Sequence, residues 1–115
     1  MASEFPARFT IQWMAYEGEG EDAHGNTVDA WADPVDRLVI GWGPPTTAEP
    51  KVAGHNRDVV DIELFVPSDW ASHPRDRGIL PDLGQIEQIG KVESTAGNPF
   101  GWVPGHVVNL RQVNG

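Results

Sequence analysis

Glycine and proline recur along the whole chain, and they limit its fold more than any other feature. The 115 residues include 13 glycines and 10 prolines, spread along the chain rather than clustered. Proline removes a helical hydrogen bond, and isolated helices shorter than about 12 residues are marginal in water. The spacing therefore predicts short strands and turns in place of helices. The length fits a single domain, residues 1–115, with a modest core.

Two stretches alternate with the period of two that is typical of a strand with one buried face. In residues 8–16 the apolar face carries Phe9, Ile11, Trp13 and Ala15. In residues 58–66 it carries Val60, Ile62, Leu64 and Val66. Further strands are expected over 27–31, 37–42, 85–92 and 106–113. These six short strands predict an all-β fold, a small antiparallel barrel or sandwich, and we favour the barrel because closure removes exposed sheet edges.

The segments between the predicted strands carry few large apolar residues. Residues 1–7 are expected to be a flexible N-terminus. Residues 17–26 combine like charges with glycine, so we expect a mobile acidic loop there. Residues 43–57 and 67–83 are rich in proline and irregular in pattern, which predicts two long connections. Compact domains keep long connections mainly for function.

Composition excludes several classes of protein. The chain has no cysteine, so disulfides, thiolate metal clusters and a cysteine nucleophile are excluded and a reducing cytoplasmic origin is expected. Acidic residues outnumber basic ones by 17 to 8, for a net charge of -9, which argues against tight DNA binding as the main function. No apolar run approaches the roughly 20 residues of a membrane span. The N-terminal residues lack the pattern of a signal peptide, so we expect no membrane partner.

Residues that could support catalysis or metal binding do not form a recognisable pattern. The histidines at positions 24, 55, 73 and 106 lack paired ligand spacing. A calcium loop would need glycine where Asp22 stands. Ser68, Asp69 and His73 lie within one short loop that lacks the strained elbow of a hydrolase. We therefore expect no enzymatic activity, no cofactor and no metal.

Three segments, read together, resemble the head-to-tail stopper, or head-closure, family of long-tailed bacteriophages, in particular siphophages of actinobacteria. They are residues 41–45 (GWGPP) with Glu49 and Pro50 behind them, residues 59–67, and residues 98–105 (NPFGWVPG) leading into 107–111. The resemblance extends from Phe9 to the end of the chain. It implies a small β-barrel that acts as a structural virion protein and not as an enzyme.

The resemblance also implies partners. Such proteins form a ring, expected here to be dodecameric, between the portal and its adaptor above and the tail terminator and tail tube below. The ring would close the channel that holds the packaged double-stranded DNA and join head to tail. The expected location is the virion, after assembly in the host cytoplasm.

Two groups of residues are matched to this role. The channel loop is expected to contain Pro44, Pro45, Thr46, Thr47, Glu49, Pro50, Lys51, His55 and Arg57. Contacts with neighbouring subunits or partners are expected at Glu17, Glu19, Glu21, Asp22, Trp70, Arg75, Arg77, Phe100 and Trp102. Lys51 and Arg57 are the cations available to meet DNA phosphate or a neighbour's carboxylate. A solvent-exposed connection without a gating role is the alternative for the channel loop.

Five tryptophans suggest a second function, a carbohydrate-binding β-sandwich in which exposed indoles stack on sugar rings. Trp13 lies on an apolar strand face, which favours the core. Trp31 and Trp42 stand at strand ends, where either role is open. Trp70 is the indole expected to be most exposed, and Trp102 is expected to pack in a turn beside Phe100.

Overall fold

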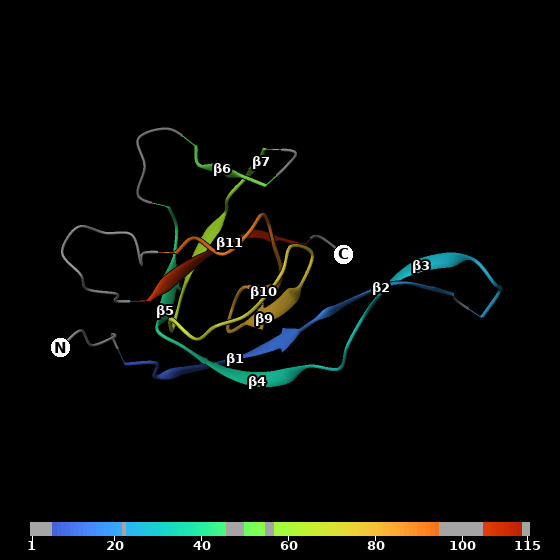
Figure 1. The fold of residues 1–115 in the computed structure, drawn as a ribbon, viewed down its shortest axis with the longest axis horizontal. Coiled ribbons are helices and arrows are strands. Elements are labelled where there is room, and N and C mark those ends of the chain that lie inside the picture. Colours follow the sequence, from blue (N-terminus) through green and yellow to red (C-terminus); the bar gives the residue numbers. More distant parts are fainter. Residues whose placement is uncertain (1–5, 22, 46–49, 55–56, 95–104, 114–115) are drawn as a thin grey trace.

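The computed structural model describes residues 6–21, 23–45, 50–54, 57–94 and 105–113. Within these ranges the chain forms strands and no helix, which confirms the predicted all-β class (Figure 1). The strands are β1 (Phe9–Met14), β2 (Tyr16–Glu21), β3 (Thr27–Trp31), β4 (Val35–Val39), β5 (Gly41–Gly43), β6 (Val52–Ala53), β7 (Asp58–Val59), β8 (Ile62–Val66), β9 (Arg77–Leu80), β10 (Gly84–Gln88) and β11 (His106–Gln112).

Seven of these strands form one antiparallel sheet in the order β4-β1-β9-β10-β11-β8-β5. Its two edge strands, β4 and β5, follow one another in the chain with only Ile40 between them. The N–H of Ile40 donates to the carbonyl of Phe65 at 2.8 Å. One continuous segment, residues 35–43, therefore pairs with β1 at one edge of the sheet and with β8 at the other.

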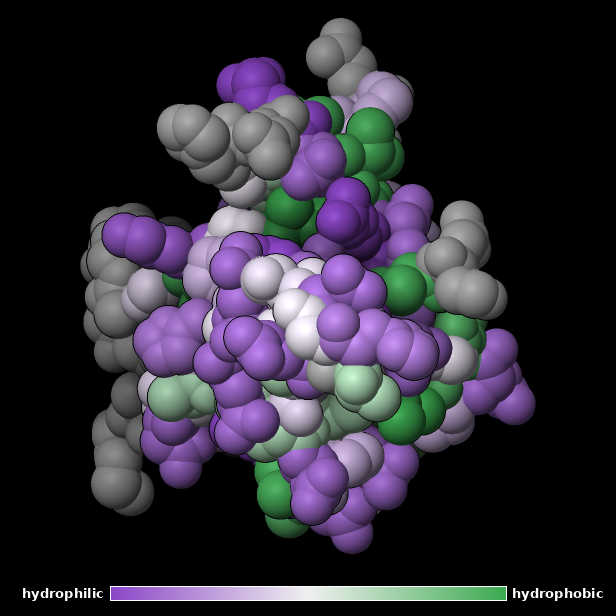
Figure 2. All heavy atoms as spheres, turned by 90° about the vertical axis from the view of Figure 1, so that its right-hand side faces the viewer, coloured by the Kyte–Doolittle hydropathy of each residue, from purple (hydrophilic) through white to green (hydrophobic). Residues whose placement is uncertain are grey.

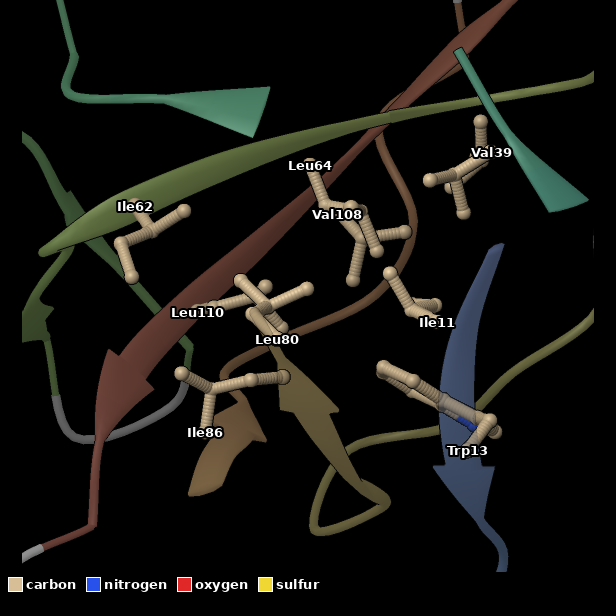
Figure 3. Close-up of a cluster of buried hydrophobic side chains, with 10 residues drawn as sticks. Ile11, Trp13, Val39, Ile62, Leu64, Leu80, Ile86, Val108 and Leu110 are labelled. Carbon is tan, nitrogen blue, oxygen red and sulfur yellow. The ribbon is translucent and has the colours of Figure 1, made fainter. Parts of the chain in front are cut away.

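The core is formed by side chains of this sheet. Its side chains come from β1, β4, β8, β9, β10 and β11 and converge on one another (Figure 3). The buried members are Ile11, Trp13, Val39, Ile62, Leu64, Val66, Leu80, Ile86, Val108 and Leu110. The alternation predicted for residues 8–16 and 58–66 is confirmed at its centre, because these strands bury every second side chain. Phe9 and Ala15 depart from it. Ala15 is exposed. Phe9 is 52% exposed, and its ring packs edge-on against Trp42, with ring centroids 5.6 Å apart.

Two short hairpins lie outside the main sheet. β2 pairs with β3, and this hairpin projects from the side of the body (Figure 1). β6 pairs with β7 in a second, smaller hairpin at another side. The molecule measures 55 × 31 × 26 Å, and the first hairpin accounts for much of the long dimension.

Three segments that were predicted to be loops or connections contain strands. The prediction of an acidic loop over 17–26 was wrong for residues 17–21, which belong to β2, and the predicted connection 67–83 contains β9. The Glu-Gly alternation of β2 itself has a period of two, and the ladder to β3 satisfies its backbone whatever the size of its side chains. Within the predicted loop 43–57, Val52 and Ala53 form β6. The strand predicted over 85–92 ends at Gln88, before Gly90 turns the chain with φ of 69°. The predicted flexible N-terminus lies mostly outside the described residues.

Candidate functional site

The β2–β3 hairpin, residues 16–31, projects from the side of the body (Figure 1), and we call it the arm. Its register pairs Gly20 with Val28 and Gly18 with Ala30, so one face is small and apolar. Glu19 stands opposite Asp29 on the other face. Figure 2 looks at this side of the molecule and shows a mostly hydrophilic surface around a pale patch. A two-stranded hairpin without a core is marginal in water, so contacts at its base must hold it.

Those contacts converge on three consecutive residues, Arg75, Asp76 and Arg77, which we call the latch. The backbone N–H of Tyr16 donates to Asp76 Oδ1 at 2.8 Å. The indole N–H of Trp31 donates to the carbonyl of Arg75 at 2.7 Å. Both strands of the arm are therefore tied to the latch where they leave the body.

Two arginines of the latch also stack on the aromatic rings of the arm. The guanidinium of Arg75 lies 4.3 Å from the ring centroid of Tyr16, and that of Arg77 lies 3.9 Å from the ring of Trp31. Arg75 also forms an ion pair with Asp29, with Nη2 and Oδ2 2.5 Å apart. Partly exposed cation–π contacts each contribute about 0.5–1 kcal/mol. Together they fix the direction in which the arm projects.

Asp76 is the buried centre of the latch, with only 3% of its surface exposed. Besides the N–H of Tyr16, its carboxylate accepts the backbone N–H of His73 at 3.0 Å and the indole N–H of Trp13 at 3.3 Å. A carboxylate held by several N–H donors is stabilised without a neighbouring cation. It links the core, through Trp13, to the first residue of the arm.

Tyr16 is the only tyrosine of the chain, so its ionisation can be followed without interference from another phenol. Its hydroxyl donates to Asp29 Oδ1 at 2.8 Å. This hydrogen bond raises the pKa of Tyr16 above its ordinary value of 10.0, while the charge of Arg75 opposes the rise. The contact therefore stabilises the arm below the ordinary pKa and is lost as the pH rises through the raised pKa.

We expect absorbance at 295 nm to give a phenolate midpoint above that of free tyrosine. Asp29→Asn should lower the midpoint, because the carboxylate that opposes ionisation is gone. Arg75→Gln should raise it further, because the cation that favours the phenolate is removed. A midpoint that neither substitution shifts would contradict this geometry.

Lys51 holds the β6–β7 hairpin against the body. Its ammonium pairs with Glu63 Oε2 at 2.5 Å and with Glu93 Oε1 at 2.7 Å. Burial lowers the pKa of Lys51, but the hydrogen bonds to Glu63 and Glu93 outweigh it, so the pKa lies above 10.5. Gly54 completes the attachment, because its backbone lies directly against Gly90.

These contacts change the interpretation of the predicted channel loop. Lys51 pairs with two carboxylates of its own chain, and its predicted contact with DNA phosphate or a neighbour's carboxylate stays a prediction. Arg57 is exposed and has a φ of 55°. Pro44 and Pro50 are exposed and Pro45 is partly buried. Thr46, Thr47, Glu49 and His55 lie outside the described residues.

Apart from Trp70, the predicted interface residues divide into three groups. Glu17, Glu19 and Glu21 lie together on the arm, all exposed. Arg75 and Arg77 belong to the latch, where the structure brings them against the base of that arm. Asp22, Phe100 and Trp102 lie outside the described residues.

Trp70, expected to be the most exposed indole, is partly buried against the core instead. Its ring meets that of Trp13 edge-on, with centroids 5.2 Å apart. The guanidinium of Arg37 covers it at 4.6 Å from the centroid, and its N–H donates to Ser72 at 2.7 Å. The sequence position, in a proline-bounded loop, gave no sign of this packing because the contacts come from β1 and β4.

Sequence reasoning missed the roles of Tyr16 and Asp76. A signal existed for Tyr16, since an aromatic residue stands at each end of the segment 16–31. Nothing local identified Asp76, which is one acid in a mixed run of charges. Asp76 binds Tyr16 and Trp13, which lie far away in the sequence.

In the ranges that the structure describes, no three His, Cys, Asp or Glu side chains are grouped so that they could hold a metal ion. Among the same residues no helix is long and apolar enough to cross a membrane. Comparison with protein-family models, curated proteins and solved structures finds no match to this chain.

Proposed function

We propose that the chain is a head-to-tail stopper, a structural subunit that forms a ring in the connector between portal adaptor and tail. The observation that carries the proposal is the arm, which is rooted by the latch and projects well beyond the body. A subunit of a ring needs an element that reaches its neighbour in a defined direction, because every contact is then repeated around the axis.

The body fits the same role if it is a closed small barrel. Residues 35–43 pair with both β1 and β8, and such a bent strand joins the edges of the sheet. A closed sheet has no free edge for strand addition. Contacts between copies would then fall to the arm and to the connections, where the sequence resemblance also places them.

The carbohydrate-binding alternative receives no support from the described tryptophans. Trp13 and Trp70 pack on each other, Trp42 packs against Phe9, and Trp31 lies under Arg77. A sugar-stacking indole must keep one face open. Trp102 lies outside the described residues.

Particle assembly tests the proposed function. Deleting the coding sequence from the phage genome that encodes this chain should give DNA-containing heads and free tails that do not join. Adding purified protein to such an extract should restore tailed particles. A variant with residues 17–30 replaced by a short Gly-Ser turn should fold but fail to restore them. Normal tailed particles from the deletion genome would refute the stopper role, and retention of the purified protein on polysaccharide would favour the alternative.

A further inference from the structure

The latch and the β6–β7 hairpin approach the same end of β10. A hollow of about 290 Å³ lies between them. Its lining includes Arg75 of the latch, Gly54 and Asp58 of the hairpin, and Gln88 at the end of β10. Two elements that project at different sides of the body therefore share one small region of it.

Gln88 connects the two elements and is only 2% exposed. On the latch side, its backbone N–H donates to the carbonyl of Asp76 at 2.8 Å, and its carbonyl accepts the N–H of Arg75 at 3.1 Å. On the hairpin side, its side-chain Nε2 donates to the carbonyl of Gly90 at 2.9 Å. Ser72 fixes the amide by donating to Oε1 at 2.5 Å. The side chain has little freedom to absorb a movement.

Gly90 lies directly against the backbone of the β6–β7 hairpin. Both Gly90 and Gly54 have positive φ, and a Cβ atom built on Gly90 would stand 2.9 Å from the backbone nitrogen of Gly54. Backbones this close leave no room for a side chain between them. A movement of Gly90 toward the hairpin would therefore press on Gly54.

A chain of charges runs parallel to this backbone route. Arg77 pairs with Glu87 at 3.2 Å, and Arg111 reaches Glu87 at 2.7 Å and Asp58 of β7 at 3.8 Å. The hydrogen bond to Glu87 raises the pKa of Arg111 above its ordinary value. The last pair is long and its side chains are half-exposed, so it contributes little. Gln88 provides the main route.

We propose that the arm and the β6–β7 hairpin are coupled through Gln88, so that displacing the arm from the latch loosens the hairpin. A partner that takes hold of the arm would then change the attachment of the hairpin on another side of the molecule. The coupling is a property of the chain by itself and does not depend on the stopper role.

Hydrogen exchange of the purified chain tests the coupling. The N–H of Val60 donates to the carbonyl of Lys51 at 2.7 Å. This hydrogen bond extends the β6–β7 ladder at the base of the hairpin, and its exchange reports whether that base stays closed. Trp31→Ala removes the ring and the N–H that bind the latch. It should speed exchange at Val60 by roughly threefold to thirtyfold, which lies within the range of coupling between networked neighbours. Val28→Ala, on the same strand but outside the latch, should leave that rate unchanged. The amide of Leu64, in the core, reports global opening, and its exchange should be accelerated less than that of Val60.

A double-mutant cycle tests the route. Gln88→Met keeps the backbone hydrogen bonds to the latch and removes the contact with Gly90. In that background Trp31→Ala should add no further acceleration at Val60. Gln88→Glu, which keeps the acceptor for Ser72, serves as the second variant should Gln88→Met not fold. An unchanged Val60 rate in Trp31→Ala overturns the coupling, and so does an equal acceleration of Val60 and Leu64. If Trp31→Ala speeds exchange at Val60 as much in the Gln88 variants as in the natural chain, Gln88 is not the route of the coupling.

Discussion

Replacement of Gly105 by alanine is expected to lower the free energy of unfolding by about 3–6 kcal/mol, from backbone strain together with overpacking. Gly105 is buried with a φ of 145°, a backbone conformation that residues other than glycine rarely adopt. A Cβ atom there would stand 2.5 Å from the carbonyl oxygen of Val66 and 2.8 Å from Ile40 Cδ1. Ile40 joins β4 to β5, so the added methyl group would clash with the segment that pairs with both edges of the sheet.

Urea unfolding of the two proteins measures this change, with Gly41→Ala as the matched control. Gly41 lies beside Ile40, and a Cβ atom there has nothing within 4 Å. We expect its stability to stay within about 0.5 kcal/mol of the natural chain. If the Gly105→Ala protein is as stable as the Gly41→Ala protein, the backbone of Gly105 is not packed closely against Val66 and Ile40.

Asp76→Asn is expected to cost about 2–4 kcal/mol of stability, in line with the loss of hydrogen bonds to a buried charged group. Three N–H groups, from Trp13, Tyr16 and His73, converge on this carboxylate. An asparagine offers one acceptor oxygen, and its NH₂ group would face donors that remain buried. With one oxygen left, either Tyr16 or the pair of His73 and Trp13 loses its acceptor. The attachment of the arm should therefore weaken.

Chemical denaturation gives the stability, and the exchange rate of the Tyr16 amide reports the arm. Asp69→Asn removes the same charge from an exposed position nearby in the chain and should change stability by less than about 0.5 kcal/mol. If Asp76→Asn matches Asp69→Asn in both measurements, the carboxylate is not the centre of the latch.

Local patterns predicted those parts of the fold that depend on a single strand. The alternation around Ile11 and Trp13, and that from Val60 to Val66, identified which side chains enter the core. Burial of one strand face follows from the sequence period alone, because neighbouring side chains point to opposite sides. The class of the fold followed in the same way from the spread of glycine and proline.

The candidate site did not follow from local patterns. The run of glutamate and glycine after Tyr16 looked like a solvated loop, because no apolar residue in it offers burial. It forms a strand because β3 completes its ladder and because the latch, some 60 residues away in the chain, holds its first residue. Nor did local patterns show that the fold brings Glu63 and Glu93 to Lys51.

The sequence by itself determined that this chain forms strands, which of its alternating residues are buried, and that its surface is acidic. Only the tertiary structure decided how the strands are ordered, that an arm projects, and that Arg75, Asp76 and Arg77 hold it. The physical reason is distance along the chain. Secondary structure and burial are encoded over a few neighbouring residues, whereas hydrogen bonds, ion pairs and ring contacts of the arm join residues that become neighbours only when the whole sheet has formed.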